Sequence, residues 1–332
     1  MSVEPRRPTI IDVARLAQVA PSTASRALKE SPRISEATRL RVRAAALGLG
    51  YQPNRVAQSL RAKTAPFVGI VVPDIGITFY SRFVKGAQEV LEASGYQALV
   101  MNTEREAGNE EAALRTLEGH QVTGILLATS RPTSGEPNRP TVYFDSLAGD
   151  RGLAQIALAN GQGMELLVEH LAEHRHERIA YIGGPPLFTS GQERLAGFRD
   201  ATKRYGVRYD AAYVEIADSS WSPDSAAAAM ARLLALAEPP TAVVASGDTL
   251  AMGAIAACRA AGRRVPDDIA LVAFDDPVHG QLVDPPVTAL RRGDYELGRE
   301  AAQLLLVGLN GDTATAVRLP VELVVRRSCG CS

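Results

Sequence analysis

Hydrophobic and polar positions in the first 50 residues follow the pattern of three short helices. Four apolar residues recur at the helical period and mark the inner face of the first helix: Ile10, Val13, Ala14 and Ala17. A second helix begins with Pro21, where the missing N–H costs nothing, and Ser35 is placed to cap a third. The buried stripe predicted for the third helix is Ala37, Leu40, Ala44, Leu47 and Tyr51. This arrangement predicts a helix-turn-helix unit.

The second of these helices has little to bury. Ala24, Ala27 and Leu28 face inward, whereas the opposite face carries Ser22, Ser25, Arg26 and Lys29. Small hydroxyl side chains allow close approach to a DNA major groove, and an arginine can make bidentate contacts with guanine. The pattern alone also fits three surface helices that have no nucleic-acid partner.

Beyond residue 66, apolar runs alternate with amphipathic helical stretches. Eight runs predict strands: FVGIVVP, QALVMNT, TGILLAT, TVYFDS, RIAYIGG, AYVEIAD, AVVASGD and IALVAFDD. Near-continuous apolar strands of this kind are typical of parallel sheets covered on both faces. Eight strands exceed the needs of one such sheet, so the predicted fold is an all-α head followed by an α/β body of two lobes. Each lobe is built on a doubly wound parallel sheet, and a cleft lies between them.

Charge separates the same two parts of the chain. The 332 residues carry a formal charge of only −1, but residues 1–65 hold twelve Lys and Arg against four Asp and Glu, a charge of +8. A small basic head attached to an acidic body is typical of proteins in which the head binds nucleic acid. A basic surface that only contacts solvent would give the same charge distribution. The chain lacks a run of about 18 apolar residues and the apolar core of a secretory leader, so we expect a cytoplasmic protein with no membrane span.

Polar or small residues end many of the predicted strands. They are Asp74, Asn102, Asp145, Gly183, Asp218, Asp248 and Asp275. Ligands of open α/β sheets bind beyond the carboxyl ends of the strands, and carboxylates there accept hydrogen bonds from hydroxyl groups. This placement predicts a site for a sugar or another polyol. Asp248 is equally well placed to cap the helix that follows it.

The sequence predicts no enzyme, no metal site and no cofactor. IGGPPLFTSG lacks the Gly-Lys-Ser/Thr of a phosphate loop, and the five histidines, His174 and His176 among them, show no nucleophile or metal-ligand spacing. Cys329 and Cys331 form a CxC motif, which supplies too few ligands for a metal.

The first 61 residues resemble the DNA-binding head of the lactose-repressor/galactose-repressor family. TIIDVA, VAPSTASR and YQPNRVAQSL match hallmarks of that family, and HERIAYIGGP, ERLAGFRDA, ASGDTLAMGAIAA and DPPVTALRR resemble its effector-binding, periplasmic-binding-protein-like body. The resemblance implies a helix-turn-helix domain over residues 1–52, a hinge helix and linker over 53–65, and a two-lobed body over 66–328. The N-lobe would take about 66–158 and 291–318, and the C-lobe about 159–290 and 319–328.

The resemblance also assigns DNA-binding roles. Pro21, Ser22 and Arg26 would read bases, and Thr23 and Ser25 would contact phosphates. In the hinge helix, Asn54 and Arg55 would hold phosphates, while Ala57 and Leu60 would lie at the centre, Leu60 as an apolar wedge that unstacks the middle base step. The expected DNA-binding set is Thr9, Pro21, Ser22, Thr23, Ser25, Arg26, Asn54, Arg55, Ala57 and Leu60.

For the cleft, the resemblance implies that Arg194 anchors ligand oxygens. The expected effector-binding set is Asp74, Phe79, Arg194, Trp221, Asp248 and Asp275. Two of these residues have a simpler alternative. Arg194 could be a surface helix residue, and Trp221 could form a hydrophobic staple before a helix capped by Ser222 with Pro223 at its first position.

The chain departs from the family pattern in the head and in the cleft. Gln18-Val19-Ala20 replaces Gly-Val-Ser in the turn, so a side-chain cap is lost. In the cleft, Ile77-Thr78-Phe79, Ser146 and Gly247-Asp248 replace Asn-Pro-Phe, Arg and Asn-Asp. We therefore expect a ligand smaller or less polar than a typical hexose.

The resulting functional prediction is a ligand-responsive transcriptional repressor that acts as a homodimer on a pseudo-palindromic operator. One head buries too little surface for tight specific binding, so two heads are needed. The alternatives are a solute-binding receptor that shares only the two-lobed body, and an enzyme. The basic head argues against the first, and the lack of an acid/base pair or metal cluster argues against the second.

Overall fold

A computed structural model describes residues 8–28, 34–49, 67–128, 137–145, 154–186, 189–217, 221–277, 280–310 and 316–331. The chain divides into two units, Met1–Ala65 and Pro66–Ser332, which are treated separately below. In the described parts, no helix has both the length and the apolar character needed to cross a membrane.

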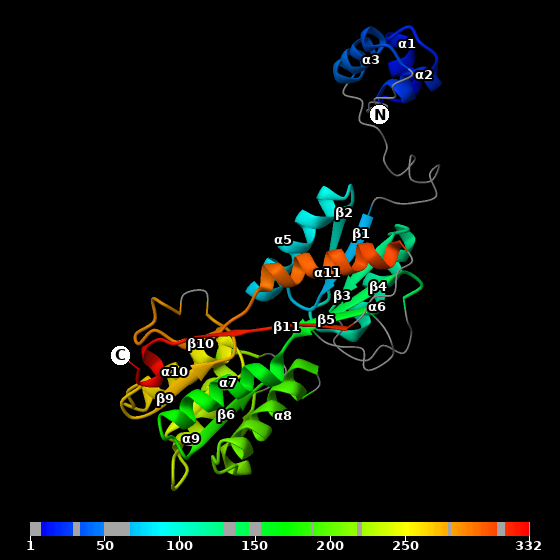
Figure 1. Cartoon of the computed structure of the whole chain (residues 1–332). Coiled ribbons are helices and arrows are strands. Elements are labelled where there is room, and N and C mark those ends of the chain that lie inside the picture. Colours follow the sequence, from blue (N-terminus) through cyan, green and yellow to red (C-terminus); the bar gives the residue numbers. More distant parts are fainter. Residues whose placement is uncertain are drawn as a thin grey trace, which may run out of the picture. The chain divides into compact units, whose positions relative to one another are not determined.

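The first unit contains the three predicted helices, α1 (Ile10–Leu16), α2 (Pro21–Leu28) and α3 (Glu36–Gly48) (Figure 1). Thr9 begins α1 with a full capping box: its hydroxyl accepts from the Asp12 N–H, and the Asp12 carboxylate accepts from the Thr9 N–H at 2.8 Å. Ser35 caps α3, as predicted. The core is made almost entirely of small side chains: Val13, Ala14, Ala17, Ala24, Ala27, Val42, Ala45 and Ala46.

The buried stripe predicted for α3 is wrong. Val42, Ala45 and Ala46 face the core, whereas Leu40 and Leu47 are 59% and 88% exposed. The prediction selected the larger apolar residues, but the close packing of α1 and α2 leaves room only for alanine and valine. Tyr51, the last residue of that predicted stripe, lies outside the described residues.

The turn between α1 and α2 is made without glycine. Gln18 has a φ of +54°, in the left-handed region that is costly for a residue with a Cβ. Ala20 accepts helical hydrogen bonds from the N–H groups of Thr23 and Ala24 through its carbonyl, but its methyl side chain offers no acceptor. The second helix therefore begins without a side-chain cap, as the sequence predicts.

The second unit holds two six-stranded sheets. The N-lobe sheet has the order β11-β5-β4-β3-β1-β2 and is parallel throughout. Its strands are β1 (Phe67–Val72), β2 (Gln97–Asn102), β3 (Gly124–Leu127), β4 (Thr141–Phe144), β5 (Ala154–Leu158) and β11 (Ala316–Leu319). Helices α5 (Thr78–Ala93) and α11 (Asp294–Leu309) cover one face, and α6 (Ala107–Gly119) covers the other (Figure 1). Alternate residues of β1 enter these two cores, which explains its continuous apolar run.

The C-lobe sheet has the order β12-β10-β9-β8-β6-β7 and is parallel except for β12. Its strands are β6 (Ile179–Gly183), β7 (Val214–Ile216), β8 (Ala242–Ala245), β9 (Ala270–Ala273), β10 (Thr288–Arg291) and β12 (Glu322–Val324). Helices α9 (Pro223–Leu234) and α10 (Asp248–Ala260) pack on one face, and α7 (Asn160–Glu173) and α8 (Thr189–Arg204) on the other. Two short 3₁₀ turns, η1 (Ala211–Tyr213) and η2 (Arg327–Cys329), complete the lobe.

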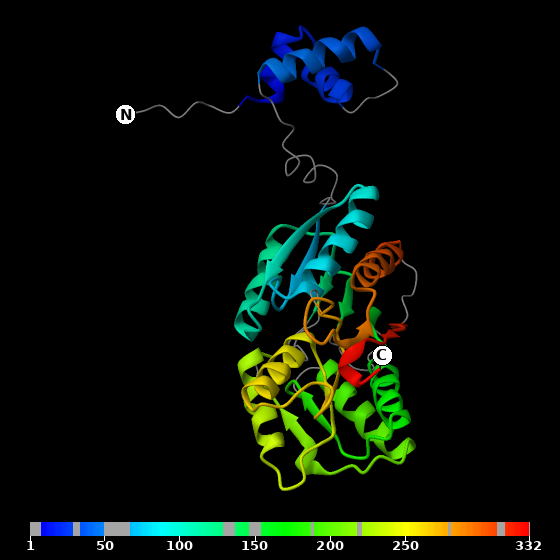
Figure 2. The same cartoon turned by 90° about the vertical axis from the view of Figure 1, so that its left-hand side faces the viewer.

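The chain passes between the two sheets three times. The crossings follow β5, β10 and β11, and Figures 1 and 2 show these segments side by side between the lobes. Within the N-lobe, α5 and α11 meet at two glycines. A Cβ on Gly86 would lie 2.0 Å from the Tyr295 carbonyl oxygen, and one on Gly298 would lie 2.0 Å from the Phe83 carbonyl oxygen. Only glycine permits this approach of two helix backbones.

The two-lobed parallel architecture and all eight predicted strands are confirmed. Four strands, β5, β10, β11 and β12, were not predicted. Polar residues such as Gln155 and Arg318 interrupt their apolar pattern, whereas their lengths of three to five residues are similar to those of the predicted strands.

The assumption that the CxC motif lacks further ligands is wrong. η2 folds back against α7, so that Cys331 Sγ lies 3.1 Å from His174 Nε2 and 3.7 Å from His170 Nε2. Helical spacing places these two histidines, four residues apart, on one face of α7. The sequence could not show that the last residues of the chain return to this helix.

We expect Ala20→Ser to stabilise the head, because a serine hydroxyl could accept from the Thr23 N–H as Thr9 does for Asp12. A cap of this kind contributes about 1 kcal/mol, which slows hydrogen exchange through opening of the head roughly fivefold. Hydrogen–deuterium exchange of α2 peptides in the full chain measures this. Ala20→Val, which adds volume without an acceptor, is the control, and equal protection in both variants would contradict the prediction.

Candidate functional site

The predicted DNA-reading residues lie on the outer side of α2. Pro21, Ser22 and Arg26 are exposed, while Thr23 and Ser25 are half-buried. The Arg26 Nε donates to the Ser22 carbonyl oxygen at 3.2 Å, which holds the guanidinium along the helix surface. The helix thus presents the predicted residues to a partner, and their contacts with DNA remain predictions. The hinge residues Asn54, Arg55, Ala57 and Leu60 lie outside the described residues.

A cavity of about 490 Å³ lies between the two lobes of the body. The carboxyl ends of β1, β4, β8, β9 and β10 meet around it, as expected for open parallel sheets. All six residues of the predicted effector-binding set line this cavity: Asp74, Phe79, Arg194, Trp221, Asp248 and Asp275. Topology therefore brings together residues that are separated by up to 201 positions in the sequence.

Arg194 is not a surface residue. Its side chain is 4% exposed, its Nε donates to Asn160 Oδ1 at 2.9 Å, and its Nη1 donates to the Ser246 carbonyl oxygen at 2.6 Å. The guanidinium also lies over the Phe274 ring, 3.8 Å from the ring centre. These contacts fix a buried cation at the wall of the cavity.

Arg292, which the sequence analysis missed, is a second buried cation in this wall. It follows β10, forms ion pairs with Asp275 at 2.7 Å and Asp294 at 3.1 Å, and lies over the Phe79 ring. Burial lowers the pKa of Arg292, but the neighbouring carboxylates, Asp275 foremost, raise it above its ordinary value. The TALRR segment of the sequence could have pointed to it, because that segment ends a strand with two basic residues.

Two carboxyl groups of the cavity are destabilised in their charged form. Burial, followed by repulsion from Asp275, raises the pKa of Asp248. Burial also raises the pKa of Asp145, against the opposing effect of the hydrogen bond that the Tyr80 hydroxyl donates to its carboxylate at 2.7 Å. A ligand that donates hydrogen bonds would relieve this cost.

Asp248 is not the cap of its helix. Gly247 occupies the cap position and α10 begins at Asp248, whose Oδ1 accepts from the Thr249 N–H at 2.7 Å. The predicted cap is thus wrong by one residue.

Trp221 borders the cavity with a backbone φ of +53°. Its indole packs against the bare backbone of two glycines: a Cβ on Gly184 would lie 2.0 Å from the ring, and one on Gly247 would lie 3.5 Å from it. Ser222 caps α9 and Pro223 stands at its start, as predicted. The ring therefore forms part of the cavity wall while its neighbours begin the helix.

The remaining strand-end residues that the sequence singled out do not all reach the cavity. Asp145 lines the cavity, whereas Asn102 and Gly183 are not among its lining residues. Asp218 and Ser146 lie outside the described residues. Several lining residues were not singled out in the sequence, including Tyr80, Arg105, Ser190 and Thr249, because they begin helices or loops rather than end strands.

Known proteins resemble both parts of the chain. Residues 9–54 match the model described as bacterial regulatory proteins, lacI family, and residues 168–329 match that of a periplasmic binding protein-like domain. The transcriptional regulator CelR of Thermobifida fusca is 35% identical over 97% of this chain and 98% of its own. The transcriptional repressor CytR of Escherichia coli is 33% identical over 96% of both chains. The chain belongs to the LacI family.

Solved structures of LacI-family proteins agree with this assignment. A lac repressor dimer bound to operator and the anti-inducer ONPF has a TM-score of 0.89, with 27% identity over 98% of this chain and 99% of that one. A complex of CelR with cellobiose has a TM-score of 0.74, with 33% identity over 97% of this chain and 100% of that one. These likenesses confirm the predicted family, fold and role as a DNA-binding transcriptional regulator, and they favour that role over a solute-binding receptor.

In this LacI-family regulator, a polar network connects the cavity to the crossings between lobes. Asn160, which accepts from Arg194, donates through Nδ2 to Glu193 Oε2 at 2.7 Å. Arg318 on β11 of the N-lobe donates through Nη1 to the same Glu193 oxygen at 2.8 Å. The ligand cavity is thus linked by direct hydrogen bonds to an ion pair between the lobes.

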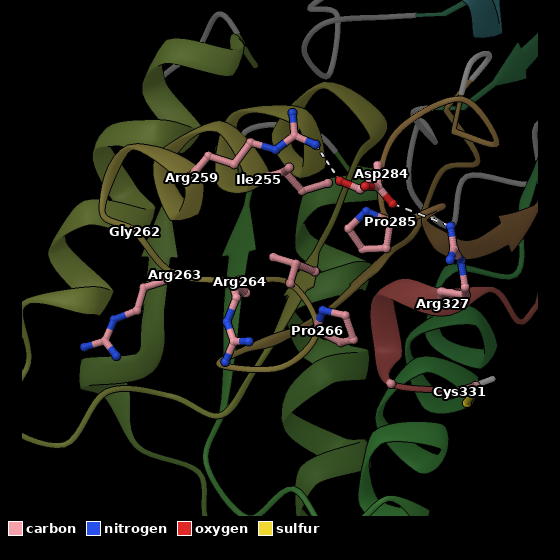
Figure 3. Close-up of a pocket in the computed structure, with 12 residues that line it drawn as sticks. Ile255, Arg259, Gly262, Arg263, Arg264, Pro266, Asp284, Pro285, Arg327 and Cys331 are labelled. Carbon is pink, nitrogen blue, oxygen red and sulfur yellow. Dashed lines mark hydrogen bonds and ion pairs between the residues drawn. The ribbon is translucent and has the colours of Figure 1, made fainter.

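A second cavity of the regulator, about 560 Å³ in volume, lies in the C-lobe (Figure 3). Four arginines line it, but three use their guanidinium groups within the protein. Arg259 donates to the Asp284 carbonyl oxygen, Arg327 pairs with the Asp284 carboxylate, and Arg264 pairs with Asp267 and Asp268. Figure 3 shows Arg263 directed away from the other three. This cavity is therefore a weaker candidate for an anion site than its composition implies.

We expect Asp248→Asn to raise the thermal stability of the regulator at pH 7. Because the folded-state pKa of Asp248 is raised, the folded state keeps its proton to higher pH, and stability falls as pH rises from about 4 through that folded pKa. Asparagine removes the buried charge, so the variant should melt at a higher temperature than the unaltered chain at pH 7, and this difference should shrink toward pH 4. Thermal melts across this range measure it. Asp200→Asn, on the exposed side of α8, is the control, and a benefit that does not depend on pH would contradict the prediction.

Proposed function

We propose that this chain is a homodimeric transcriptional repressor whose affinity for a pseudo-palindromic operator changes when a sugar binds in the interlobe cavity. The observation that carries the proposal is the lining of that cavity. Carboxylates of Asp145, Asp248 and Asp275 line it together with the guanidinium groups of Arg194 and Arg292, and Asp275 pairs with both arginines. Residues 9–54 match the DNA-binding head of the LacI family, and we infer that the regulator acts in the cytoplasm.

The chemistry of the cavity favours a sugar over an apolar ligand. Each hydroxyl of a sugar both donates and accepts, so it can satisfy an aspartate and an arginine at once. The face of the Trp221 ring suits the apolar C–H surface of a pyranose. The volume of about 490 Å³ lies within the range of small-molecule sites. The charged lining supports a polar ligand, in contrast to the reduced polarity that the sequence predicted from its missing family residues.

The names of the relatives support the same class of ligand. CelR has been solved with cellobiose, and the ribose operon repressor of Bacillus subtilis is 31% identical over 96% of this chain and 98% of its own. We infer a sugar or a related polyol here, with Arg194 as its charged anchor. The lac repressor relative is a dimer on its operator, which supports two heads and two half-sites for this chain.

A ligand in the cavity would act on DNA through lobe closure. Arg194, Asn160 and Glu193 belong to the C-lobe, whereas Arg318 belongs to the N-lobe, so a small shift of Arg194 alters the ion pair across the crossings. The ligand changes operator affinity only to the extent that it binds the closed and open states differently. Through the dimer, closure would change the spacing of the paired hinge helices, in which Leu60 is the proposed wedge.

We expect the purified chain to select a pseudo-palindromic sequence from a pool of randomised duplexes. Arg26→Ala should weaken the base preference at one position in each half-site of the selected sequence. Loss of a bidentate arginine–guanine contact costs about 1–3 kcal/mol, or roughly 5- to 150-fold in affinity for the selected operator. Arg41→Ala, an exposed arginine of α3, is the control for charge alone. Equal loss on operator and random DNA, or enrichment of no sequence, would contradict base reading by Arg26.

For the effector, we expect one sugar from a panel of monosaccharides and disaccharides to raise the melting temperature and change operator affinity. Arg194→Lys keeps the charge but loses the fork that binds Asn160 and the Ser246 carbonyl. The sugar response should fall by at least about tenfold while operator binding stays intact. Arg204→Lys, on the exposed end of the same helix, should respond normally. An unchanged response in Arg194→Lys would remove Arg194 from the ligand site.

A further inference from the structure

Three potential metal ligands converge at the edge of the C-lobe core, outside the interlobe cavity, and a fourth lies beside one of them. The ligand atoms of His170, Cys329 and Cys331 all lie within 4.8 Å of one another. His174 joins them, with its Nε2 at 3.1 Å from Cys331 Sγ and its ring centre 4.6 Å from that of His170. Two imidazoles and two thiols are the ligand set of many structural zinc sites.

The spacing of these atoms suits a tetrahedral ion. Zinc lies about 2.3 Å from sulfur and about 2.0–2.1 Å from nitrogen, so neighbouring ligand atoms of a tetrahedron are about 3.3–3.8 Å apart. The distances from Cys331 Sγ to the histidine nitrogens, 3.1 and 3.7 Å, are near this range. His174 lies outside the group whose ligand atoms are all within 4.8 Å of one another, so an ion bound by all four residues would draw its ring inward.

The backbone of η2 directs both thiols to one side. Gly330, between the cysteines, has a φ of +92°, which reverses the chain within one residue and is readily adopted only by glycine. Ser328 anchors the turn, because its hydroxyl donates to the Leu271 carbonyl oxygen at 2.6 Å and accepts from the Thr288 N–H at 2.8 Å. The CxC segment is therefore held by the sheet, independently of the histidines.

Hydrogen bonds outside the cluster prepare the ligand atoms. His174 Nδ1 lies 2.8 Å from the His170 carbonyl oxygen. A carbonyl only accepts, so Nδ1 carries the proton and Nε2 presents its lone pair toward Cys331. Ligating histidines in metal sites are typically oriented by such a bond. The Thr288 hydroxyl is 3.1 Å from Cys329 Sγ, where it can donate to a thiolate.

We propose that His170, His174, Cys329 and Cys331 bind one zinc ion, which ties the C-terminal segment to α7. Binding releases two thiol protons to the solvent, so that Zn²⁺ and two thiolates form a neutral centre. The site does not depend on the sugar response proposed above.

The site is placed where an ion can enter. His170 and Cys329 are buried among the apolar residues between α7 and the sheet, whereas His174 is exposed and Cys331 is half-buried. Cys331 also lines the second cavity, and Figure 3 shows it at the end of the C-terminal segment beside a helical ribbon. The ion would therefore be held between a buried pair and an accessible pair of ligands, at the edge of the C-lobe core.

The test uses the full chain without an affinity tag, stripped of metal by a chelator under reducing conditions. We expect one equivalent of Zn²⁺ per chain by elemental analysis, and a higher melting temperature after zinc is added. Co²⁺ should give the intense visible bands of a tetrahedral site together with thiolate-to-cobalt charge-transfer absorption. His174→Ala and Cys331→Ser should each weaken zinc binding by at least about 100-fold, since loss of groups that merely support a ligand costs roughly 10–100-fold.

The matched controls are His120→Ala, an exposed histidine at the end of α6, and Cys258→Ala in α10, both of which should bind metal as the unaltered chain does. Zinc binding of less than one equivalent, a six-coordinate cobalt spectrum, or unchanged affinity in both ligand variants would overturn the proposal. A disulfide between Cys329 and Cys331 that persists under reducing conditions would also overturn it. Operator binding measured in parallel separates this result from a failure of the proposed function.

Discussion

The body of the protein depends on a buried cluster of charges where β9 and β10 end. Asp275 is 11% exposed in its side chain and lies between two guanidinium groups, that of Arg292 at 2.7 Å and that of Arg194 at 3.6 Å. An isolated charge in such a position would be very costly, and loss of one partner from a buried ion pair typically costs about 3–5 kcal/mol. The arrangement is tolerated because each guanidinium has further partners besides Asp275. Arg194 lies over the Phe274 ring and donates to the Ser246 carbonyl oxygen, and Arg292 lies over the Phe79 ring.

The position of this cluster explains why the cavity is both polar and mechanically important. Arg292 follows β10, directly before the chain crosses to α11, and its guanidinium lies over Phe79 of the N-lobe while it pairs with Asp275 of the C-lobe. A ligand that enters the cavity therefore meets charges already shared between the lobes. Contacts that a ligand makes with these residues would compete with pairs that already join the two lobes.

Sequence reasoning recovered the parts of the molecule that depend on local pattern. The capping box of Thr9, the start of α9 at Pro223 and eight of the twelve described strands follow from local pattern, and the six expected cavity residues come from strand ends and family resemblance. Residues whose role depends on long-range packing were missed. Arg292 gains its partners only when β9 and β10 lie side by side, and Leu47 is exposed because α3 meets the rest of the head through alanines. The return of Cys331 to α7, 157 residues from His174, has no local signature at all.

Among the described residues, seven with a β-carbon have a positive φ, and several of them border the interlobe cavity. Arg105, Asp145 and Trp221 line the cavity and Gln18 forms the turn before α2, whereas Glu104, Gln121 and Arg175 are not among the lining residues. Such conformations cost about 1–3 kcal/mol each and persist only where the surrounding structure enforces them. In the body, well-packed sheets supply that enforcement. The head has a buried core of alanine and valine, and Ala20 offers α2 no side-chain acceptor, so less side-chain packing is available there to hold Gln18. The strained turn of the head is therefore held mainly by the backbone hydrogen bonds of α1 and α2 on either side of it.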